Sequence, residues 1–412
     1  MSLQPTPHPE AKKLTDADYP DFLLLDADLP ADVIELRDRI RAFGRDVVFD
    51  VINEYWERAE FPPEVLKGLA ELGIAGGQIS GYGCPGHSEL AMGIVARELA
   101  MIDGSVNTFF GVHSGLGMGA IHTLGDEEQR QRWLPAMARF EKTGAFGLTE
   151  PYHGSDSVSL ETSARREGDE WVLNGHKRWI GNGHQGDVIV VFARGEADGQ
   201  VKAFVVEKRG DGSYPEGYRP TAIEGKFGKR AIQQADIEIE NLRIPETNRL
   251  QNCNSFKDVN KVLGATRGGV AWEACGHGVA AFAVARQYAL DRTQFGAPIA
   301  GYQLVQEKLA TMLAGVTQNE LLCRRMIELI DRGEFTHAMA SMMKMQTVRN
   351  SLEVCRIGRD MMGGNGVLLE NRVARHLSDM EVVATYEGTD SMQALILGRE
   401  ITGVSAFTNV KR

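Results

Sequence analysis

The clearest candidate for proton chemistry in this chain is a carboxylate near its C-terminal end. Glu387 lies in the stretch Tyr386-Glu387-Gly388-Thr389, directly before a run of helical apolar spacing that Gly403 would end. Thr389 suits a helix N-cap, and Gly388 lets the backbone turn sharply. A carboxylate aimed into a cleft there can act as a general base. The alternative is a solvated glutamate in front of a helix cap.

A second candidate is the stretch FGLTEPYHGSD, from Phe146 to Asp156, which mixes apolar residues with small hydrogen-bond donors. Backbone N–H groups near Gly154 and the hydroxyl of Ser155 can hold an anionic group, while Leu148 and Thr149 can border a planar ring. The same composition also suits a simple turn at a domain boundary.

Other familiar patterns give no support for a different chemistry. The run from Gly81 to Gly86 matches G-x-G-x-x-G but has no strand–helix context, so we interpret it as a loop. The ten histidines show no H-E-x-x-H or similar spacing, which predicts no metal site, and His113 and His122 suit core or capping roles. No G-x-S-x-G elbow is present, so serine hydrolase chemistry has no support.

The elements that must position these residues follow the order α, β, α. Apolar residues recur at helical spacing over 33–43, 65–72, 90–102 and 127–140, and again over 262–292, 304–332 and 336–362, before the final helix. Between them, 187–192, 201–206 and 235–239 are rich in β-forming residues, and Asn174-Gly175 predicts a tight hairpin. We expect an arm (1–29), an N-terminal α-helical domain (30–143), a middle β-barrel domain (144–250) and a C-terminal α-helical domain (251–412).

Composition limits the class of protein. The 412 residues carry a net charge of −11, which argues against nucleic acid as the main partner. The five scattered cysteines indicate free thiols in a reducing compartment. The polar, proline-containing start does not resemble a secretion signal, and no apolar run reaches the ~18 residues of a membrane span. We expect a soluble, cytoplasmic protein.

Five motifs in order carry a resemblance to a known family: FGLTEPYHGSD, NGHKRWIGNG, DRTQFGAPI, MMGGNG and ATYEGTDSMQALILGREITG. From about Pro30 to Phe407 the chain resembles the acyl-CoA dehydrogenase family. It is most similar to the glutaryl-CoA dehydrogenase branch and to plant short-chain acyl-CoA oxidases. The resemblance implies an α+β fold with an N-terminal α-helical domain, a middle β domain and a C-terminal four-helix bundle.

The resemblance also implies an FAD flavoprotein of fatty acid β-oxidation that removes two hydrogens from an acyl-CoA thioester to give the trans-2-enoyl-CoA. Glu387 would take the α-proton while the β-hydrogen leaves as hydride to flavin N5. The Glu387 backbone N–H would help to hold the thioester oxygen. Electrons would pass to an electron-transfer flavoprotein.

By the same resemblance, two sets of residues would line the site. The FAD set would be Phe146, Leu148, Thr149, Gly154, Ser155, Trp179, Ile180, Gly181, Arg292, Phe295, Gln303, Asp360, Met361, Met362, Gly363, Gly364, Thr389 and Phe407. The substrate set would be Asn107, Thr108, Ser155, Leu263, Thr266, Arg267, Tyr386 and Gly388. Arg292, Gln303 and the segment 360–364 would reach the FAD of a neighbouring subunit, in a homotetramer that is a dimer of dimers. Without the resemblance, Trp179 could be a strand core aromatic and Arg292 a helix C-terminal cation.

Three departures from the family pattern affect the prediction. Some members carry the base at the position of Thr266, which leaves Glu387 as the base here. Glutaryl-CoA enzymes carry an arginine where this chain has Asn107; because Asn107 and Thr108 cannot neutralise a carboxylate, we expect a short or branched uncharged acyl chain rather than glutaryl-CoA. Most members have Thr at Gly181, whereas the plant oxidases have Gly.

Gly181 therefore keeps an acyl-CoA oxidase reducing oxygen to hydrogen peroxide open as an alternative. A non-catalytic acyl-CoA-binding scaffold and a flavin monooxygenase on the same fold are further alternatives.

Overall fold

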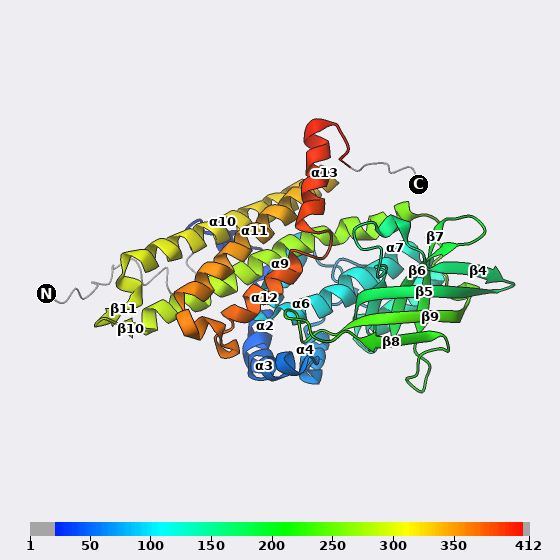
Figure 1. Cartoon of the computed structure of the whole chain (residues 1–412), viewed down its shortest axis with the longest axis horizontal. Coiled ribbons are helices and arrows are strands. Elements are labelled where there is room, and N and C mark those ends of the chain that lie inside the picture. The colour runs from blue at the N-terminus through cyan, green and yellow to red at the C-terminus, as the bar shows by residue number, and fades with distance from the viewer. Residues whose placement is uncertain (1–20, 407–412) are drawn as a thin grey trace. The chain divides into compact units, whose positions relative to one another are not determined.

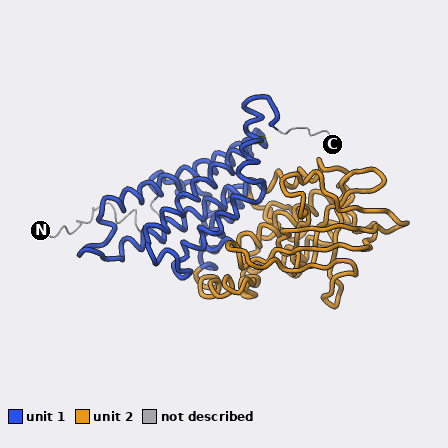
Figure 2. Tube along the Cα trace, viewed as in Figure 1, with its two compact units in different colours: residues 1–44, 89–104, 267–412 blue, residues 45–88, 105–266 orange. Residues whose placement is uncertain are grey.

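The computed structural model of the chain describes residues 21–406. These residues form two compact units, shown in Figure 2, each built from separate stretches of the sequence. Unit 1 contains residues up to 44, 89–104 and from 267 onward, and unit 2 contains residues 45–88 and 105–266. Within residues 21–406, none of the helices combines the length and the hydrophobicity of a membrane-spanning segment.

Unit 1 is helical. Its long helices α10 (Gln303–Asp331) and α11 (His337–Met361) pack side by side (Figure 1), and α11 also packs against α12 (Val373–Val383) and α13 (Asp390–Thr402). The unit also contains α2 (Ala31–Phe43), α5 (Glu89–Ile102) and most of α9 (Phe256–Asp291). Its shorter elements are η1 (Leu25–Asp28), β10 (Thr293–Gln294), β11 (Ala297–Pro298), η6 (Ile299–Gly301), η7 (Gly363–Val367) and η8 (Leu369–Asn371).

A buried ionic network joins three helices of unit 1. The guanidinium group of Arg97 on α5 is fully buried and lies 2.7 Å from Glu98 and 2.6 Å from Glu320 on α10. Arg41 on α2 lies 2.8 Å from the same Glu98. The buried charges are thus compensated on several sides, as a buried ion pair requires. Close to this network, Gly276 of α9 leaves no room for a side chain, because an added Cβ would lie 2.2 Å from the Arg97 carbonyl oxygen.

Unit 2 combines short helices with one large sheet. Its helices are η2 (Gly44–Val48, from Arg45 onward), α3 (Phe49–Arg58), α4 (Pro63–Leu72), α6 (Gly104–Phe110, from Ser105 onward), η3 (Gly111–Met118), α7 (Gly119–Leu124), α8 (Glu127–Ala138), η4 (Ser157–Ser159) and η5 (Glu246–Asn248). His113 is fully buried, accepts from the Gly144 N–H at 2.9 Å and lies 3.0 Å from the Met137 carbonyl oxygen. Burial lowers the pKa of His113 to about 4, so it is a neutral core residue, one of the two roles predicted for it.

The sheet of unit 2 has seven strands. They are β3 (Gly144–Gly147), β4 (Ser163–Glu167), β5 (Glu170–Gly181), β6 (Val188–Gly195), β7 (Val201–Glu207), β8 (Tyr218–Ala222) and β9 (Gln234–Pro245). Their order is β3-β6-β4-β5-β9-β8, with β7 also paired to β6. β3 and β4 run parallel to β6, and the other pairs are antiparallel. Their buried apolar residues, including Trp171, Ile189 and Phe204, form the core of this part of the unit.

The predicted hairpin at Asn174-Gly175 is wrong. β5 runs straight through these residues, and the true turn joins β4 to β5 near Gly168, where φ is +65°. Asn174-Gly175 instead marks a register shift between β5 and β9. Gly175 is needed because an added Cβ would lie 2.7 Å from the Cα of Thr162, and the Asn174 side chain accepts from the Asn241 N–H at 2.8 Å. The dipeptide serves a bulge rather than a turn.

Most predicted helices are confirmed, and two details differ. The segment from Gly81 to Gly86 is not simply a loop, because Ser80–Gly81 (β1) pairs with Cys84–Pro85 (β2). The sequence reading also missed α12. The buried face of α12 includes Arg375, His376 and Asp379, so its apolar spacing is interrupted by polar residues that are nevertheless inside.

Candidate functional site

The candidate base lies in a left-handed turn directly before α13 (Figure 1). Glu387 has a φ of +53° and Gly388 a φ of +86°, so two consecutive residues adopt a conformation that most side chains avoid. Thr389 caps α13, since its hydroxyl accepts from the Met392 N–H at 3.2 Å. Backbone strain at a non-glycine residue persists only where the surroundings hold it, and it concentrates at functional sites.

Two buried side chains of unit 1 hold this turn. The Lys344 ammonium group, on α11, donates to the carbonyl oxygens of Tyr386 and Gly388. The Gln393 amide, on α13, donates to the carbonyl oxygens of Glu387 at 2.9 Å and Gly388 at 3.0 Å. Both side chains are only 1% exposed. The three carbonyl groups of the strained turn are thus fixed from two helices.

The charges near the turn are mixed. Burial lowers the pKa of Lys344 to about 8, against the attraction of Glu387, Glu273 and Asp390 and with a further contribution from Arg267. The Tyr386 hydroxyl donates to the Glu273 carboxylate at 2.5 Å. Sequence reasoning found Glu387 and Arg267 but missed Lys344, Gln393 and Glu273. A lysine inside the methionine-rich run 342–345 was the available signal for Lys344.

Trp179, in unit 2, is the most unusual of the predicted cofactor residues. Its φ is +64°, at a register shift between β5 and β9, and its side chain is 54% exposed. The Arg178 guanidinium lies over its ring, 5.4 Å from the centroid. The alternative of a strand core aromatic is therefore wrong: a bulge turns a large aromatic face outward.

The structure brings the two predicted cofactor stretches of unit 2 together. The Arg178 N–H donates to the Thr149 carbonyl oxygen at 2.9 Å, which joins the end of β5 to the segment after β3. Beneath them the fully buried Lys177 donates to Leu148 O at 3.2 Å and to the Glu150 carboxylate at 2.8 Å. Burial lowers the pKa of Lys177 to about 8 despite the attraction of Glu150.

The Glu150 carboxylate stays charged in this buried position. Burial alone would raise its pKa, but the Lys177 charge and hydrogen bonds from the Glu161 N–H and Thr162 hold it below the ordinary value. Sequence reasoning missed this ion pair, although both residues lie inside the motifs that it singled out. Lys177 and Glu150 act as a common support for the two stretches.

The side chains of these stretches divide into buried and exposed groups. Phe146, Leu148 and Ile180 are buried, and the Phe146 ring packs 4.7 Å from that of Phe192. Gly154 and Ser155 are exposed. The outward surface of this region therefore includes the Trp179 indole, the exposed Tyr152 side chain, and the hydroxyl and backbone donors of the loop.

Gly181 has no free space beside it. An added Cβ would lie 2.9 Å from a methyl group of Val112 and 3.6 Å from Ile232. The room that a side chain at position 181 would need is thus occupied by the β-branched Val112 on η3. The glycine at position 181 thus occurs together with Val112, a neighbouring side chain that sequence reasoning did not identify.

The predicted substrate residues Asn107 and Thr108 lie on α6, and a lysine lies beside them. Lys229 is 1% exposed and donates to the Thr108 hydroxyl at 2.8 Å. Its φ of +46° places it in the left-handed region. The Asn182 amide donates to the carbonyl oxygens of Phe109 at 3.4 Å and Gly144 at 3.2 Å, so α6 lies close to the end of β5. Sequence reasoning missed this cation, which comes from a segment about 120 residues away.

The residues predicted to reach the FAD of a neighbouring subunit lie at the end of unit 1 that contains β10 and β11. Asp360, near the end of α11, is 16 residues from Lys344, or roughly 24 Å along the helix axis. Figure 1 shows β10 and β11 at one end of the long helices and α13 toward the other. Phe295, in the turn between β10 and β11, is 97% exposed, and the other exposed members of the set are Arg292, Gln303, Asp360, Gly363 and Gly364. Met361 is half-buried and Met362 is buried. Within one copy, these residues are not brought to the Glu387 turn.

The remaining predicted residues lie on α9 or outside the described part. Leu263 and Thr266 are half-buried, and the Thr266 hydroxyl donates to the Leu263 carbonyl oxygen at 3.2 Å. Arg267 follows directly on the same helix and is also half-buried. Phe407 lies outside the described residues.

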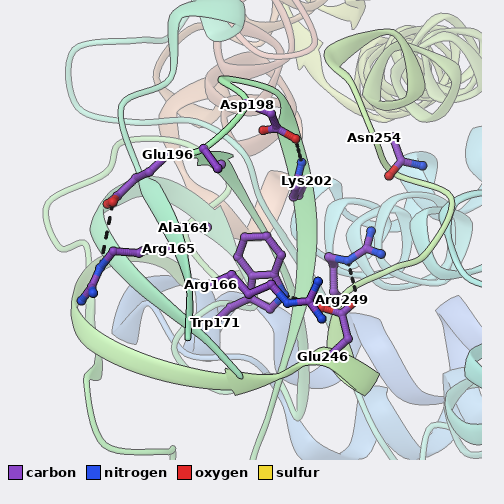
Figure 3. A pocket seen from close by; sticks show the side chains of 12 residues that line it. Ala164, Arg165, Arg166, Trp171, Glu196, Asp198, Lys202, Glu246, Arg249 and Asn254 are labelled. Carbon is purple, nitrogen blue, oxygen red and sulfur yellow. Dashed lines mark hydrogen bonds and ion pairs between the residues drawn. The ribbon is translucent and has the colours of Figure 1, made fainter. Parts of the chain in front are cut away.

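Unit 2 also contains a cavity of about 620 Å³ that is lined by residues other than the predicted site residues (Figure 3). Its charged lining residues are largely paired with one another, for example Lys202 with Asp198 at 2.6 Å and Arg249 with Glu246 at 2.9 Å. It contains none of the predicted site residues. The cavity is therefore not the candidate site.

Comparisons with known proteins agree along the chain. Models of the acyl-CoA dehydrogenase N-terminal, middle and C-terminal domains match residues 30–141, 145–242 and 256–402. The chain is 31% identical to a 3-(aryl)acrylate reductase of Clostridium sporogenes, covering 89% of this chain and 97% of that protein. It is also 31% identical to a mitochondrial short-chain specific acyl-CoA dehydrogenase of Bos taurus, with 90% of each covered.

Solved structures give the same result. A glutaryl-CoA dehydrogenase from Mycobacterium smegmatis superposes with a TM-score of 0.90 at 36% identity, covering 94% of this chain and 99% of that one. A second glutaryl-CoA dehydrogenase from that organism, in complex with FADH2, has a TM-score of 0.89 at 32% identity, covering 93% and 97%. A butyryl-CoA dehydrogenase from Megasphaera elsdenii has a TM-score of 0.85 at 28% identity, covering 91% and 99%.

Proposed function

Because this chain belongs to the acyl-CoA dehydrogenase family, FAD-dependent oxidoreductases acting on CH–CH bonds, we propose that Glu387 is the base that removes the α-proton of its acyl-CoA substrate. The observation that carries the proposal is the turn itself. A non-glycine residue with a carboxylate is held in a left-handed conformation by two buried side chains, in front of a capped helix. The fold itself does not require a glutamate at position 387, because a glycine there would adopt the left-handed conformation without strain.

The residues of unit 2 suit a flavin. Trp179 offers an exposed aromatic face, while Thr149, Ser155 and the backbone near Gly154 offer the neutral donors that a ring edge and a pyrophosphate need. We assign these residues to FAD, and Thr389 beside Glu387 to the same cofactor. When bound, FAD supplies the acceptor for the hydride that leaves the β-carbon.

The chain's own residues then have two tasks. The Glu387 carboxylate accepts the α-proton, and the Glu387 backbone N–H donates to the thioester oxygen, which makes the α-C–H more acidic. One preorganised donor of this kind is typically worth about 3–4 kcal/mol in a water-poor site. Substrate contacts are assigned to the full predicted set: Asn107, Thr108, Ser155, Leu263, Thr266, Arg267, Tyr386 and Gly388.

We further propose that the electrons pass to an electron-transfer flavoprotein. A solved structure described as an electron transferring flavoprotein of Acidaminococcus fermentans superposes with a TM-score of 0.85 at 28% identity. The alternative is an oxidase that reduces oxygen, and it is favoured by the absence of a hydroxyl at Gly181.

We propose a short or branched uncharged acyl chain as the substrate, in line with the short-chain specific relative from Bos taurus. A second substrate class, an acyl chain that ends in a carboxylate, is favoured by Lys229. Its ammonium lies 2.8 Å from the Thr108 hydroxyl and supplies the cation that Asn107 and Thr108 lack.

The separation along α11 supports an oligomer with shared sites. Arg292, Gln303 and the end of α11 are exposed and lie roughly 24 Å from Lys344. We assign them to the FAD of a second copy, within a homotetramer. An arginine suits a pyrophosphate because its fork donates two hydrogen bonds.

The test is the visible spectrum of the purified, anaerobic protein, recorded before and after butyryl-CoA or glutaryl-CoA is added and again on admitting air. We expect a flavin band that butyryl-CoA bleaches faster than glutaryl-CoA, and bleaching that persists in air. Faster bleaching by glutaryl-CoA would instead assign the second substrate class, an acyl chain that ends in a carboxylate and pairs with Lys229. Rapid reoxidation with hydrogen peroxide would identify an oxidase, and a protein without flavin would contradict the proposal.

The matched variant is Glu387→Gln, which keeps the shape of the side chain but removes the base. General base catalysis contributes about 10²–10⁴-fold, so we expect bleaching to slow by that factor while the flavin band is unchanged. Retention of α-proton exchange in D2O by Glu387→Gln would contradict the assignment.

A further inference from the structure

We propose that Lys344 is the positioning residue of the reaction: it holds the peptide groups on both sides of Glu387 so that the carboxylate and the Glu387 N–H point at the substrate. The inference rests on the proposed role of Glu387. It concerns a residue that the sequence motifs did not single out, on a different helix from the base.

The first argument is peptide geometry. Lys344 donates to the Tyr386 carbonyl oxygen, and this carbonyl belongs to the same peptide group as the Glu387 N–H. No described peptide bond is cis, so the C=O and N–H of that group point in opposite directions. Lys344 therefore turns the Glu387 N–H away from α11. A hydrogen bond to the carbonyl also polarises the peptide group, which strengthens its N–H as a donor to the thioester oxygen.

The second argument is the conformation that Lys344 maintains. The same ammonium donates to the Gly388 carbonyl oxygen, so it forms hydrogen bonds with the residues directly before and after Glu387. Between those two points, Glu387 and Gly388 keep φ values of +53° and +86°. Gln393 fixes the remaining carbonyl, that of Glu387. A lysine on a long helix gives a rigid reference for this turn, which sites on loops otherwise lack.

The third argument is charge. The groups whose charges act on Lys344 are Glu387 in the turn, Glu273 and Arg267 on α9, and Asp390 on α13. Burial lowers the pKa of Lys344 to about 8, so near neutral pH it is still mainly an ammonium. A cation beside Glu387 favours the ionised carboxylate, which is the form that accepts a proton. Lys344 thus both orients Glu387 and stabilises the ionised form of its carboxylate.

The test compares Lys344→Met and Lys344→Arg with the wild-type holoenzyme in steady-state turnover of butyryl-CoA and α-proton exchange in D2O. Loss of one aligned donor typically costs about 10²–10³-fold in kcat, so we expect about a 10²-fold loss for Lys344→Met with KM changed less than threefold. The acid limb of its pH–rate profile is expected to move to higher pH. Lys344→Arg, which retains the cation, should recover at least tenfold of the loss.

The matched control is Lys202→Met. Lys202 is a largely buried lysine in β7, paired with Asp198 at 2.6 Å, and belongs to the separate cavity of Figure 3. We expect this variant to lower the thermal midpoint without moving kcat or the pH profile. If Lys344→Met behaves like Lys202→Met, with lower stability but unchanged kcat and pH profile, Lys344 is merely structural and the inference is overturned.

Two further measurements separate the possible failures. If Lys344→Met does not fold, Lys344→Gln provides the same comparison with a neutral donor, and an unchanged acid limb in that variant would count against the charge argument. If Glu387→Gln keeps full α-proton exchange, the proposed function itself is wrong. If Glu387→Gln is inactive while Lys344→Met keeps full kcat and the wild-type pH profile, only the inference about Lys344 is wrong.

Discussion

Two buried lysines, one in each unit, support predicted site residues in different ways. Lys177 in unit 2 pairs with the Glu150 carboxylate at 2.8 Å and donates to Leu148 O in the stretch that we predict to bind FAD. Lys344 in unit 1 donates to two carbonyl oxygens of the turn that carries the base. Burial lowers the pKa of each to about 8. Glu150 neutralises the charge of Lys177. Lys344 is instead bound by uncharged carbonyl groups, so its positive charge can act on the neighbouring Glu387 carboxylate.

The largest effect on stability should come from breaking the ion pair. Lys177→Met leaves the Glu150 carboxylate buried without its cation, and losing one partner of a buried pair typically costs about 3–5 kcal/mol. We expect the free energy of unfolding, measured by urea denaturation, to fall by that amount. The control is the double variant Lys177→Met, Glu150→Leu, which should recover more than half of the loss. An equal loss in both variants would show that the charge is not the cause.

A smaller effect should appear in the pH dependence of stability. In the folded state the pKa of Lys344 is about 8, below its ordinary value of 10.5, so between these pH values the unfolded chain binds more protons at this residue. This contribution makes the free energy of unfolding rise with pH across that window, by at most about 1.4 kcal/mol per pH unit. Lys344→Met should remove it. The quantity to measure is the difference between wild type and variant, because the raised pKa values of Cys84 and Cys253 act in the opposite direction. A difference that does not vary with pH would contradict the burial of a charged Lys344.

The smallest effect is expected at the exposed side of the same turn. Arg349 on α11 forms two hydrogen bonds of 2.8 Å with Asp390, the first residue of α13, but the Arg349 side chain is 51% exposed. Exposed ion pairs contribute about 0–1 kcal/mol, so Arg349→Ala should lower stability by about 0.5 kcal/mol and kcat by less than threefold. Thermal unfolding and turnover measure the two changes. A larger loss of kcat would mean that the Arg349–Asp390 pair helps to hold the turn in addition to Lys344 and Gln393.

Local signals in the sequence were sufficient where one residue decides the structure. Thr389 caps α13 and Gly403 ends it with a φ of +70°, as predicted, because capping depends on neighbouring residues alone. His113 lies in the core, which is one of the two roles, core or cap, predicted for it. Asn174-Gly175 was misread, because the same dipeptide satisfies a turn or a bulge and only the approach of Thr162 decides between them.

The supports of the site depend on contacts between distant segments, which spacing does not encode. Lys344 is about 40 residues from the turn that it holds, and Lys229 about 120 residues from Thr108. The burial of each lysine depends on the packing of its whole unit. The roles of the predicted site residues stay predictions, as do the three domain boundaries; the arm at 1–29 lies mostly outside the described residues.

The contact between Gly181 and Val112 has a consequence for how this site can change over generations. A side chain at position 181 would place its Cβ 2.9 Å from a Val112 methyl group, and a β-branched valine has little freedom to yield. A lineage that starts from this chain can therefore reach a larger residue at 181 readily only after position 112 has become smaller. The reverse order passes through a crowded intermediate, so the first of the two substitutions determines whether the second is accessible.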